Sequence, residues 1–313
     1  MTYDSPFDIG LAGLLLAIAL WTIAARTNFP AIVLYMIYGL VLAIVWVRLS
    51  AVDVALTETA IGGGVTSMLL LGAAARLQRT NVATEQIGFP ARIATGVLCI
   101  FVSAGLSFAI YLRPDVVQTL APMAKENLAE SGLGNPVAGV LFVYRALDTL
   151  LEKVVLLLAL VGVWSLAKDQ AWGSVPGFRV YAQPSGILVF LAQILPPVGI
   201  IVGIYMFWAG ANYPGGAFQG GTVLAAMWLL VMMARLQDVP RTSALWVRLF
   251  LVVGPVAFLA IGLSGFVFAG SFLGYPEGHA KPLIIIAEAT LTLSIGVTLA
   301  LLVAGPPERM PQR

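Results

Sequence analysis

Long runs of apolar residues, separated by short polar or glycine-rich stretches, make up most of this 313-residue chain. The runs are continuous and lack the period-two alternation of membrane-barrel strands, so they favour helices. At 1.5 Å per residue, about twenty residues cross a hydrocarbon core of roughly 30 Å. We therefore predict an all-α, polytopic membrane protein with about nine transmembrane helices. They are expected near residues 7–25, 29–47, 52–77, 91–112, 138–166, 185–209, 215–234, 244–270 and 282–304.

Composition and the loop charges support this reading and add an orientation. Apolar residues make up 60% of the chain and charged residues 10%, and the mean hydropathy is +0.95, outside the range of soluble domains. Arg and Lys concentrate in cytoplasmic loops, and placing the N-terminus outside puts eleven of them in the cytoplasm and four outside. We predict N-out, C-in. The first run has no basic segment before it and no cleavage site, so it is expected to be a retained span.

Several classes of chemistry are absent from the sequence. One cysteine, Cys99, and one histidine, His279, provide neither a disulfide nor a set of metal ligands. There is no Walker loop, no dinucleotide-binding glycine motif and no Ser-His-Asp candidate. The net charge of +2 is spread over the loops, which argues against nucleic acid as a partner. We predict no cofactor, no metal and no independent enzyme, so redox or ATP-driven chemistry would reside on partner chains.

The apolar run at residues 135–166 contains four charged residues: Arg145, Asp148, Glu152 and Lys153. In one α-helix the first three, with Thr149, fall on one side, with Lys153 at its edge, so that acids and bases can pair at i, i+3 and i+4. A single charge at the centre of a membrane helix costs about 2.5 to 3.5 kcal/mol on insertion scales, so the group needs partners, water or a function. The alternative is an interfacial turn with snorkelling side chains.

Further acids lie in other runs. Glu58 is about two turns into the third run, with Asp53 at its mouth, and Glu288 is about two turns into the last. Asp53 and His279, in the last external loop, are candidates for relaying protons, although a lone loop histidine is usually just solvated. Near Glu58 the triplet Gly62–Gly64 indicates either close helix packing or a local bulge. Glu288 can instead be a protonated, hydrogen-bonded residue of a helix bundle.

A glycine-rich turn, PGGAFQGG, joins the sixth and seventh runs. Free N–H groups at the start of the seventh helix, with its dipole, can bind an anion or polarise water, and a plain tight hairpin explains the glycines equally well. The residues concerned are Pro214, Gly215, Gly216, Phe218, Gln219, Gly220 and Gly221.

Two segments between the apolar runs have their own expected roles. The external segment 113–135 is expected to hold a surface helix around residues 121–130, ended by Gly132. The segment 168–183 is expected to join two modules.

Three segments of the chain resemble membrane subunits of Mrp-type multisubunit Na+/H+ antiporters and of membrane-bound hydrogenases. NPVAGVLFVYRALDTLLEKVVLL is similar to a charged segment near the C-terminus of the large antiporter subunit, matching at Arg145, Asp148, Thr149 and Glu152. Ala146 and Leu151 replace expected glycines, and Val143 stands where the antiporter form usually has an acid. The branch of the family therefore stays open at this point.

The other two segments extend the resemblance over most of the chain. DVALTETAIGG resembles a small hydrogenase and Mrp domain related to the complex I membrane protein whose third helix can distort, with Val52 replacing the usual proline. PGGAFQGG resembles the Pro-Gly-Gly-Gly-Phe-Gln-Gly-Gly signature of the MnhB-like antiporter subunits, changed only at Ala217, within a similarity over roughly 184–304.

The resemblance implies a fusion of the C-terminal part of the large antiporter subunit, which corresponds to the hydrogenase D and E subunits, with an MnhB-like subunit. We expect three modules: 1–85, three helices like the hydrogenase D and complex I J subunits; 86–170, two helices including the charged one; and 171–313, four helices of the MnhB-like type. The implied setting is a bacterial or archaeal inner membrane, and the implied partners are the lipid bilayer and other membrane subunits, including large antiporter-like ones.

The implied function is that of one component of a multisubunit Na+/proton antiporter. Four carboxylates, Glu58, Asp148, Glu152 and Glu288, are expected to carry or release the ion. Arg145 and Lys153 are expected to tune them and to neutralise the row. Two alternatives are a membrane component of a hydrogenase or complex-I-like redox complex, and a scaffold whose charges are buried salt bridges. The transported ion and the stoichiometry are not fixed by the sequence.

Overall fold

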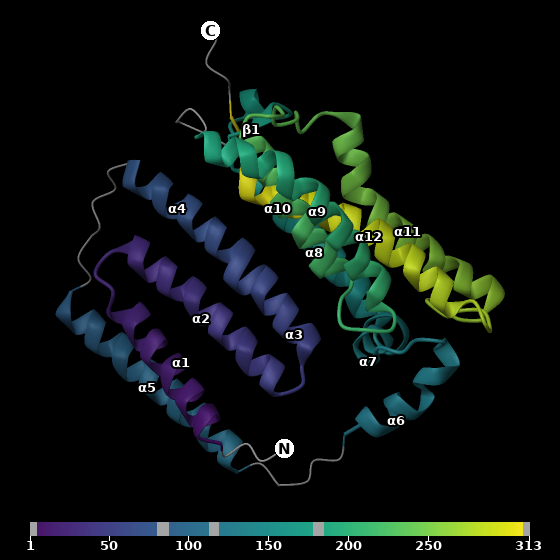
Figure 1. The fold of residues 1–313 in the computed structure, drawn as a ribbon, viewed down its shortest axis with the longest axis horizontal. Coiled ribbons are helices and arrows are strands. Elements are labelled where there is room, and N and C mark those ends of the chain that lie inside the picture. The colour runs from purple at the N-terminus through teal and green to yellow at the C-terminus, as the bar shows by residue number, and fades with distance from the viewer. Residues whose placement is uncertain (1–4, 80–87, 113–118, 178–184, 309–313) are drawn as a thin grey trace.

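The computed structural model describes residues 5–79, 88–112, 119–177 and 185–308. The N-terminal part begins with an antiparallel pair, α1 (Pro6–Ala24) and α2 (Asn28–Arg48), joined by a short turn. A third helix follows in three pieces: α3 (Val52–Thr57), the π-helical η1 (Glu58–Thr66) and α4 (Ser67–Arg79). These pieces form one apolar span, and η1 packs against α2. Figure 1 shows them as the purple and blue helices.

The π segment settles the question raised by the glycine triplet, because both expected features are present. Gly62–Gly64 lie within η1, where the backbone leaves the α-helical hydrogen-bond pattern. Close packing is present too, since a Cβ added to Gly39 of α2 would lie 3.1 Å from the backbone nitrogen of Gly63. Glycines therefore allow η1 both to bulge and to approach its neighbour.

Helix α5 (Phe89–Tyr111) differs from its neighbours because none of its residues is buried. In Figure 1 it lies on the same side of the molecule as α1, well away from α8. A short surface helix follows, α6 (Ala121–Glu126) with the 3-10 turn η2 (Asn127–Ser131), and it ends at Gly132 with φ +70°. The predicted surface helix and its terminating glycine are thus confirmed.

The charged segment is a broken helix, in contrast to the single helix expected. It consists of α7 (Pro136–Gly139), the π-helical η3 (Val140–Tyr144) and α8 (Ala146–Ser165). Arg145 between them has φ −133° and ψ 36°, which lies outside the helical region. The 3-10 turn η4 (Asp169–Ala171) follows, and β1 (Val175–Pro176) then pairs antiparallel with β2 (Pro307–Glu308) near the end of the chain.

The C-terminal part contains the core of the molecule. It is formed by α9 (Gly186–Gly210), α10 (Ala217–Met233), α11 (Leu245–Phe268) and α12 (Ala280–Ala304). Helix α12 lies at the centre and packs against α8, α9, α10 and α11. Much of its length is buried, and its side chains at Ile284, Leu291 and Ile295 are almost completely enclosed. This bundle provides the rigid side of the site described below.

The structure confirms the predicted all-α class, since all regular secondary structure of the described residues is helical apart from the β1–β2 pair. Seven of the described helices are long and apolar enough to cross a membrane. The expected spans at 138–166 and 215–234 fall outside this set. Helix α8 is long enough with 20 residues but carries three charged side chains, Asp148, Glu152 and Lys153, and α10 has only 17 residues. The count of nine and the N-out, C-in orientation therefore stay predictions.

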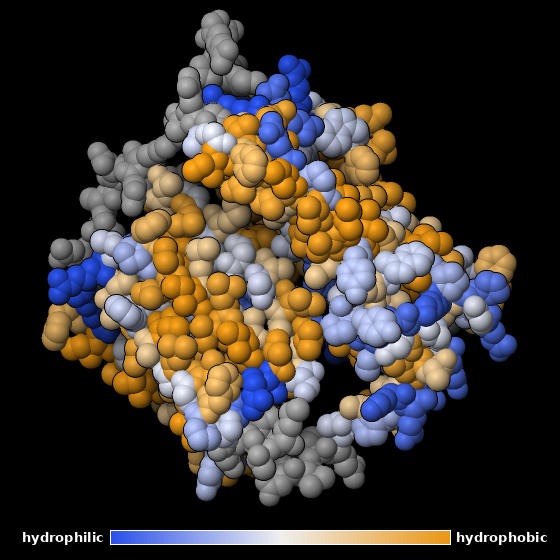
Figure 2. Space-filling model, viewed as in Figure 1, coloured by the Kyte–Doolittle hydropathy of each residue, from blue (hydrophilic) through white to orange (hydrophobic). Residues whose placement is uncertain are grey.

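The surface is apolar over wide areas, as expected for a membrane protein. Figure 2 shows hydrophobic side chains over much of the visible face, with hydrophilic ones mainly at its edges. On α5 the large side chains Phe101, Ile110 and Tyr111 are exposed. A surface of this kind is stable only against lipid or neighbouring membrane chains.

Candidate functional site

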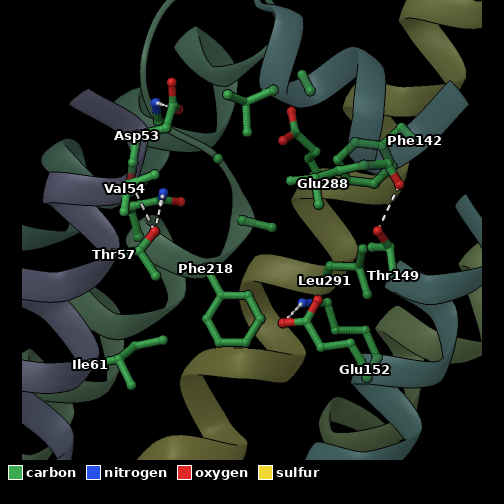
Figure 3. A pocket seen from close by; sticks show the side chains of 18 residues that line it. Asp53, Val54, Thr57, Ile61, Phe142, Thr149, Glu152, Phe218, Glu288 and Leu291 are labelled. Carbon is green, nitrogen blue, oxygen red and sulfur yellow. Dashed lines mark hydrogen bonds and ion pairs between the residues drawn. The ribbon is translucent and has the colours of Figure 1, made fainter. Parts of the chain in front are cut away.

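A cavity of about 270 Å³ lies where α3, α8, α10 and α12 meet, and we call it the central cavity. Its charged lining residues are Asp53, Glu152, Lys153 and Glu288, and its walls are otherwise mainly apolar. Figure 3 shows Asp53 and Thr57 on one side and Glu152 and Thr149 on the other, with Phe218 and Glu288 between them. The fold thus brings together four charged residues that are up to 235 positions apart in the sequence, since 288 − 53 = 235.

The glycine-rich turn between α9 and α10 forms one wall of the central cavity. Gly215 and Gly216 have φ +154° and +132°, values that L-residues with side chains rarely adopt. A Cβ on Gly215 would also lie 2.5 Å from the carbonyl oxygen of Met206, which accepts the N–H of Gly216 at 2.9 Å. The glycines therefore allow a tight turn in which the N–H of Gly215 points to Asp53 and that of Ala217 points to Glu288.

Asp53 is held by that turn. Its Oδ1 accepts the N–H of Gly215 at 3.0 Å and the side-chain amide of Asn135 at 3.3 Å. The buried Asn135 amide also donates to the carbonyl oxygens of Gly210 and Tyr213, at 3.1 and 3.0 Å. Asp53 and Asn135 consequently tie α3, the start of α7 and the α9–α10 turn into one unit.

Glu288 is the most enclosed acid of the site, with 2% of the residue exposed. The N–H of Ala217, at the start of α10, hydrogen-bonds its carboxyl group, and Asp53 is close enough to interact with it electrostatically. Its Oε2 is buried and has no hydrogen-bond partner among the described residues. Because a buried carboxylate without full pairing is costly, this oxygen is a natural place for a proton or a water molecule.

Lys153 enters the central cavity from the opposite side. It is 4% exposed, whereas the side chain of Glu152 is 49% exposed. Its Nζ lies 3.5 Å from Glu152 Oε1 and 3.7 Å from the centroid of the Phe218 ring. The buried ammonium thus has a half-exposed carboxylate and an aromatic face as neighbours, and the ring attracts it through its quadrupole.

The break at Arg145 is held by side chains that bond to the backbone before it. The π turn before it frees backbone carbonyls, and two side chains satisfy them: Thr149 donates to Leu141 at 2.6 Å and Tyr275 donates to Phe142 at 3.0 Å. Burial raises the pKa of Tyr275, so its hydroxyl keeps the proton that it donates. The break therefore separates the register of the residues before it from the register of α8.

Arg145 and Asp148 lie outside the central cavity. They line a second, more open cavity of about 620 Å³ between residues 143–148 and 271–275, which we call the outer pocket. Their side chains are 71% and 54% exposed and form an ion pair, with 2.5 Å between Arg145 Nη2 and Asp148 Oδ2. The four charges of the sequence stripe thus divide into an inner and an outer pair.

Glu58 and His279 lie outside the central cavity. Glu58 starts η1, and its carboxyl group packs over Gly62 toward Gly39 of α2, so it does not line the central cavity. His279 is exposed, and its Nδ1 lies 2.9 Å from the carbonyl oxygen of Glu277. Gln219 of the glycine-rich motif does line the central cavity, and its side-chain amide donates to Thr57 at 3.0 Å. Gly220 and Gly221 provide close contacts between helices.

Two positioning residues escaped the sequence reasoning. Asn135 accepts the N–H of Val137 and so caps α7, a role that Asn before Pro136 could have signalled. Tyr275 carries no such signal, because its partner carbonyl is freed only by the π turn. Among the described residues, no group of three or more His, Cys, Asp or Glu side chains is arranged to hold a metal ion.

Comparisons with known proteins match both halves of the chain. The family model MbhD, described as the D subunit of MBH, matches residues 13–79, and "Domain related to MnhB subunit of Na+/H+ antiporter" matches residues 187–305. A protein of Staphylococcus aureus (strain MRSA252) named "Putative antiporter subunit mnhB2" is 31% identical over 110 residues, which are 35% of this chain and 70% of that protein.

Two longer matches extend over more of the chain. A protein of Rhizobium meliloti (strain 1021), named as a probable K(+)/H(+) antiporter A/B subunit, is 26% identical over 278 residues, covering 78% of this chain and 27% of that protein. A chain in the structure of the Mrp complex from Dietzia sp. DQ12-45-1b superposes with a TM-score of 0.77 at 24% identity, covering 99% of this chain and 36% of that one. This likeness shows the fold, and the present chain spans only about a third of these longer relatives.

Proposed function

We propose that this chain, which belongs to the family of MnhB-related antiporter subunits, is one component of a multisubunit cation/proton antiporter in a cell membrane. Support comes from the two matched family regions and from the apolar, multi-helix fold. The relatives' names point the same way, since each describes part of an antiporter. The proposed partners are other membrane subunits, including large antiporter-like chains, which would cover part of the exposed apolar surface.

The observation that best supports a role in proton transfer is that Lys153 and Glu288 are enclosed in the same cavity. Two oppositely charged groups buried in an apolar wall can each hold a proton, and a proton can move between them through water in a space of about 270 Å³. Glu152, which is half exposed, provides a route between this site and the surface. We assign proton holding to Glu288 and Lys153, and proton exchange with the surroundings to Glu152.

The counter-ion is proposed to be Na+, because the matching family model is described by a Na+/H+ antiporter. The name of the Rhizobium meliloti relative specifies K+, so K+ is the alternative to test. Both ions can be measured in the same assay. Proton uptake or release by membrane vesicles from the native cell is followed with a pH-sensitive dye after addition of either salt.

The decisive variant is Glu288→Gln, which keeps the shape of the side chain but cannot exchange a proton. We expect cation-dependent proton exchange to fall at least about tenfold while the complex still assembles, since loss of an acid–base group typically costs that much or more. The matched control is Glu277→Gln, the same change at an exposed glutamate in the loop before α12, which should exchange at the wild-type rate. Equal rates in both variants would refute the proposal.

A redox-linked complex is the second candidate, favoured by the MbhD match over residues 13–79. In that case the same cavity would couple ion movement to electron transfer on partner chains. Purification of the tagged chain in mild detergent, followed by identification of its partners, distinguishes the two candidates. Antiporter-like membrane subunits alone support exchange, and co-purifying iron–sulfur or nickel proteins support the redox-linked complex.

A further inference from the structure

Phe218 lies directly beside the buried ammonium of Lys153 in the central cavity. Its ring centroid lies 3.7 Å from Lys153 Nζ, and Ala217, the residue before it, provides the N–H that hydrogen-bonds Glu288. Gln219, the residue after it, donates to Thr57 of α3. One aromatic side chain thus stands where contacts from α3, α8 and α12 converge on the first turn of α10 (Figure 3).

The two glutamates that line the central cavity with Lys153 differ in their surroundings. The side chain of Glu152 is half exposed, and its Oε1 lies 3.5 Å from Nζ. Glu288 is enclosed and its Oε2 has no partner among the described residues. An ionised carboxylate that is enclosed gains more from an ammonium than one that keeps part of its surface exposed. Whenever Glu288 has lost its proton, the pairing of Lys153 with Glu152 therefore needs something that holds the ammonium on that side.

The Phe218 ring is placed to hold the Lys153 ammonium on the Glu152 side. Its face attracts the ammonium, which gains a partner without crossing the cavity. Motion of the short turn at residues 215–219 would move this ring and the N–H that contacts Glu288 together, because both belong to the same backbone segment. Removing the ring from Nζ and freeing the carboxyl group are thus mechanically linked.

We propose that Phe218 is a gate that determines whether the Lys153 ammonium pairs with Glu152 or with Glu288. With the ring over Nζ, Lys153 stays on the Glu152 side. When the ring turns away, the ammonium reaches the ionised carboxylate of Glu288. There one N–H bond breaks and one O–H bond forms, so that both groups become neutral. This inference rests on the proposed function and assigns Phe218 the role of a positioning residue.

The test compares Phe218→Leu with Phe218→Tyr and Phe250→Leu in the assembled complex. Leucine removes the aromatic face, and tyrosine retains it. Phe250 of α11 lies outside the central cavity and packs edge-on against Trp246, with 6.3 Å between the ring centroids, so Phe250→Leu controls for the loss of a ring. We expect Phe218→Leu to lower exchange about tenfold, as for a lost proton-transfer step, with the other two close to the wild type.

A spectroscopic measurement tests the switch apart from transport. The infrared signal of the Glu288 carboxyl group is isolated as the difference between the wild type and Glu288→Gln. We expect this signal to shift in Phe218→Leu, because the ammonium then contacts Glu288, and to stay unchanged in Phe250→Leu. Phe218→Met, which lacks a ring but fills similar space, replaces Phe218→Leu if the latter fails to assemble.

The possible results distinguish a failure of the proposed function from a failure of the Phe218 gate alone. Wild-type exchange in both Glu288→Gln and Lys153→Gln overturns the proposed function and, with it, the gate. Loss of exchange in those variants, with a wild-type rate or an unshifted Glu288 signal in Phe218→Leu, overturns the gate alone. A shifted signal together with reduced exchange, both retained near wild type in Phe218→Tyr, supports it.

Discussion

The inner and outer ion pairs of the segment 136–165 lie about one helical turn apart, yet their surroundings are opposite. Lys153 is almost fully buried beside Glu152, whereas Arg145 and Asp148 are largely exposed in the outer pocket. An exposed pair of this kind contributes about 0 to 1 kcal/mol, because water screens it. A buried charge that loses its partner can cost about 3 to 5 kcal/mol. The burial of a charged side chain, more than the number of charges in a segment, therefore indicates which of them has a functional role.

The largest effect is expected from breaking the inner pair at Lys153. In Lys153→Gln the cavity loses its cation, so Glu288 has no group to exchange a proton with and Glu152 loses its partner. We expect cation-dependent exchange to fall at least about tenfold, as for other essential acid–base groups. Vesicles carrying the variant are compared at equal amounts of assembled complex.

Lys281→Gln is the matched control for this prediction. Lys281 is also a lysine of a helical segment, but its Nζ donates to Asn212 at 2.9 Å in an exposed contact outside the central cavity. Its substitution should leave exchange near the wild-type rate. If Lys281→Gln and Lys153→Gln lowered exchange equally, the inner pair would have no special role.

An intermediate effect is expected at Asp53, which contacts the central cavity but is held by the backbone. Asp53→Asn removes the charge from a hydrogen bond with the Gly215 N–H, and such charge-assisted bonds contribute about 1.5 to 3 kcal/mol. We expect a lower midpoint of thermal unfolding of the purified complex. The exposed Asp238 gives the control, since Asp238→Asn should leave the midpoint unchanged. An unchanged midpoint in Asp53→Asn would show that the turn does not depend on this charge.

Local features of the fold could be predicted from the sequence because neighbouring residues determine them. Gly132 ends the surface helix, as expected for a residue with positive φ, and the Gly62–Gly64 triplet lies in the π segment. Apolar runs set the helices to within a few residues. These features follow from backbone preference and from the cost of exposing apolar groups.

The central cavity could be predicted only in part. Its glutamates were identified as acids within apolar runs, but their grouping depends on contacts between distant residues, such as Asp53 with Gly215. The division of the charged stripe also escaped prediction, because an ideal helix places Arg145 and Glu152 on one side. The turn at Arg145 is stabilised by Tyr275, 130 positions further along the chain, since 275 − 145 = 130.

The smallest effect is expected from breaking the outer pair with Arg145→Gln and Asp148→Asn together. Because both side chains are largely exposed, removing both charges should change stability by less than about 1 kcal/mol. The sequence pattern alone places Asp148 among the ion-carrying residues, whereas its position in the outer pocket, away from the central cavity, favours an exchange rate close to that of the wild type. The double variant is measured beside Lys153→Gln in the same vesicles. A loss as large as that of Lys153→Gln would place the outer pocket on the ion route and make the two pairs steps of one pathway.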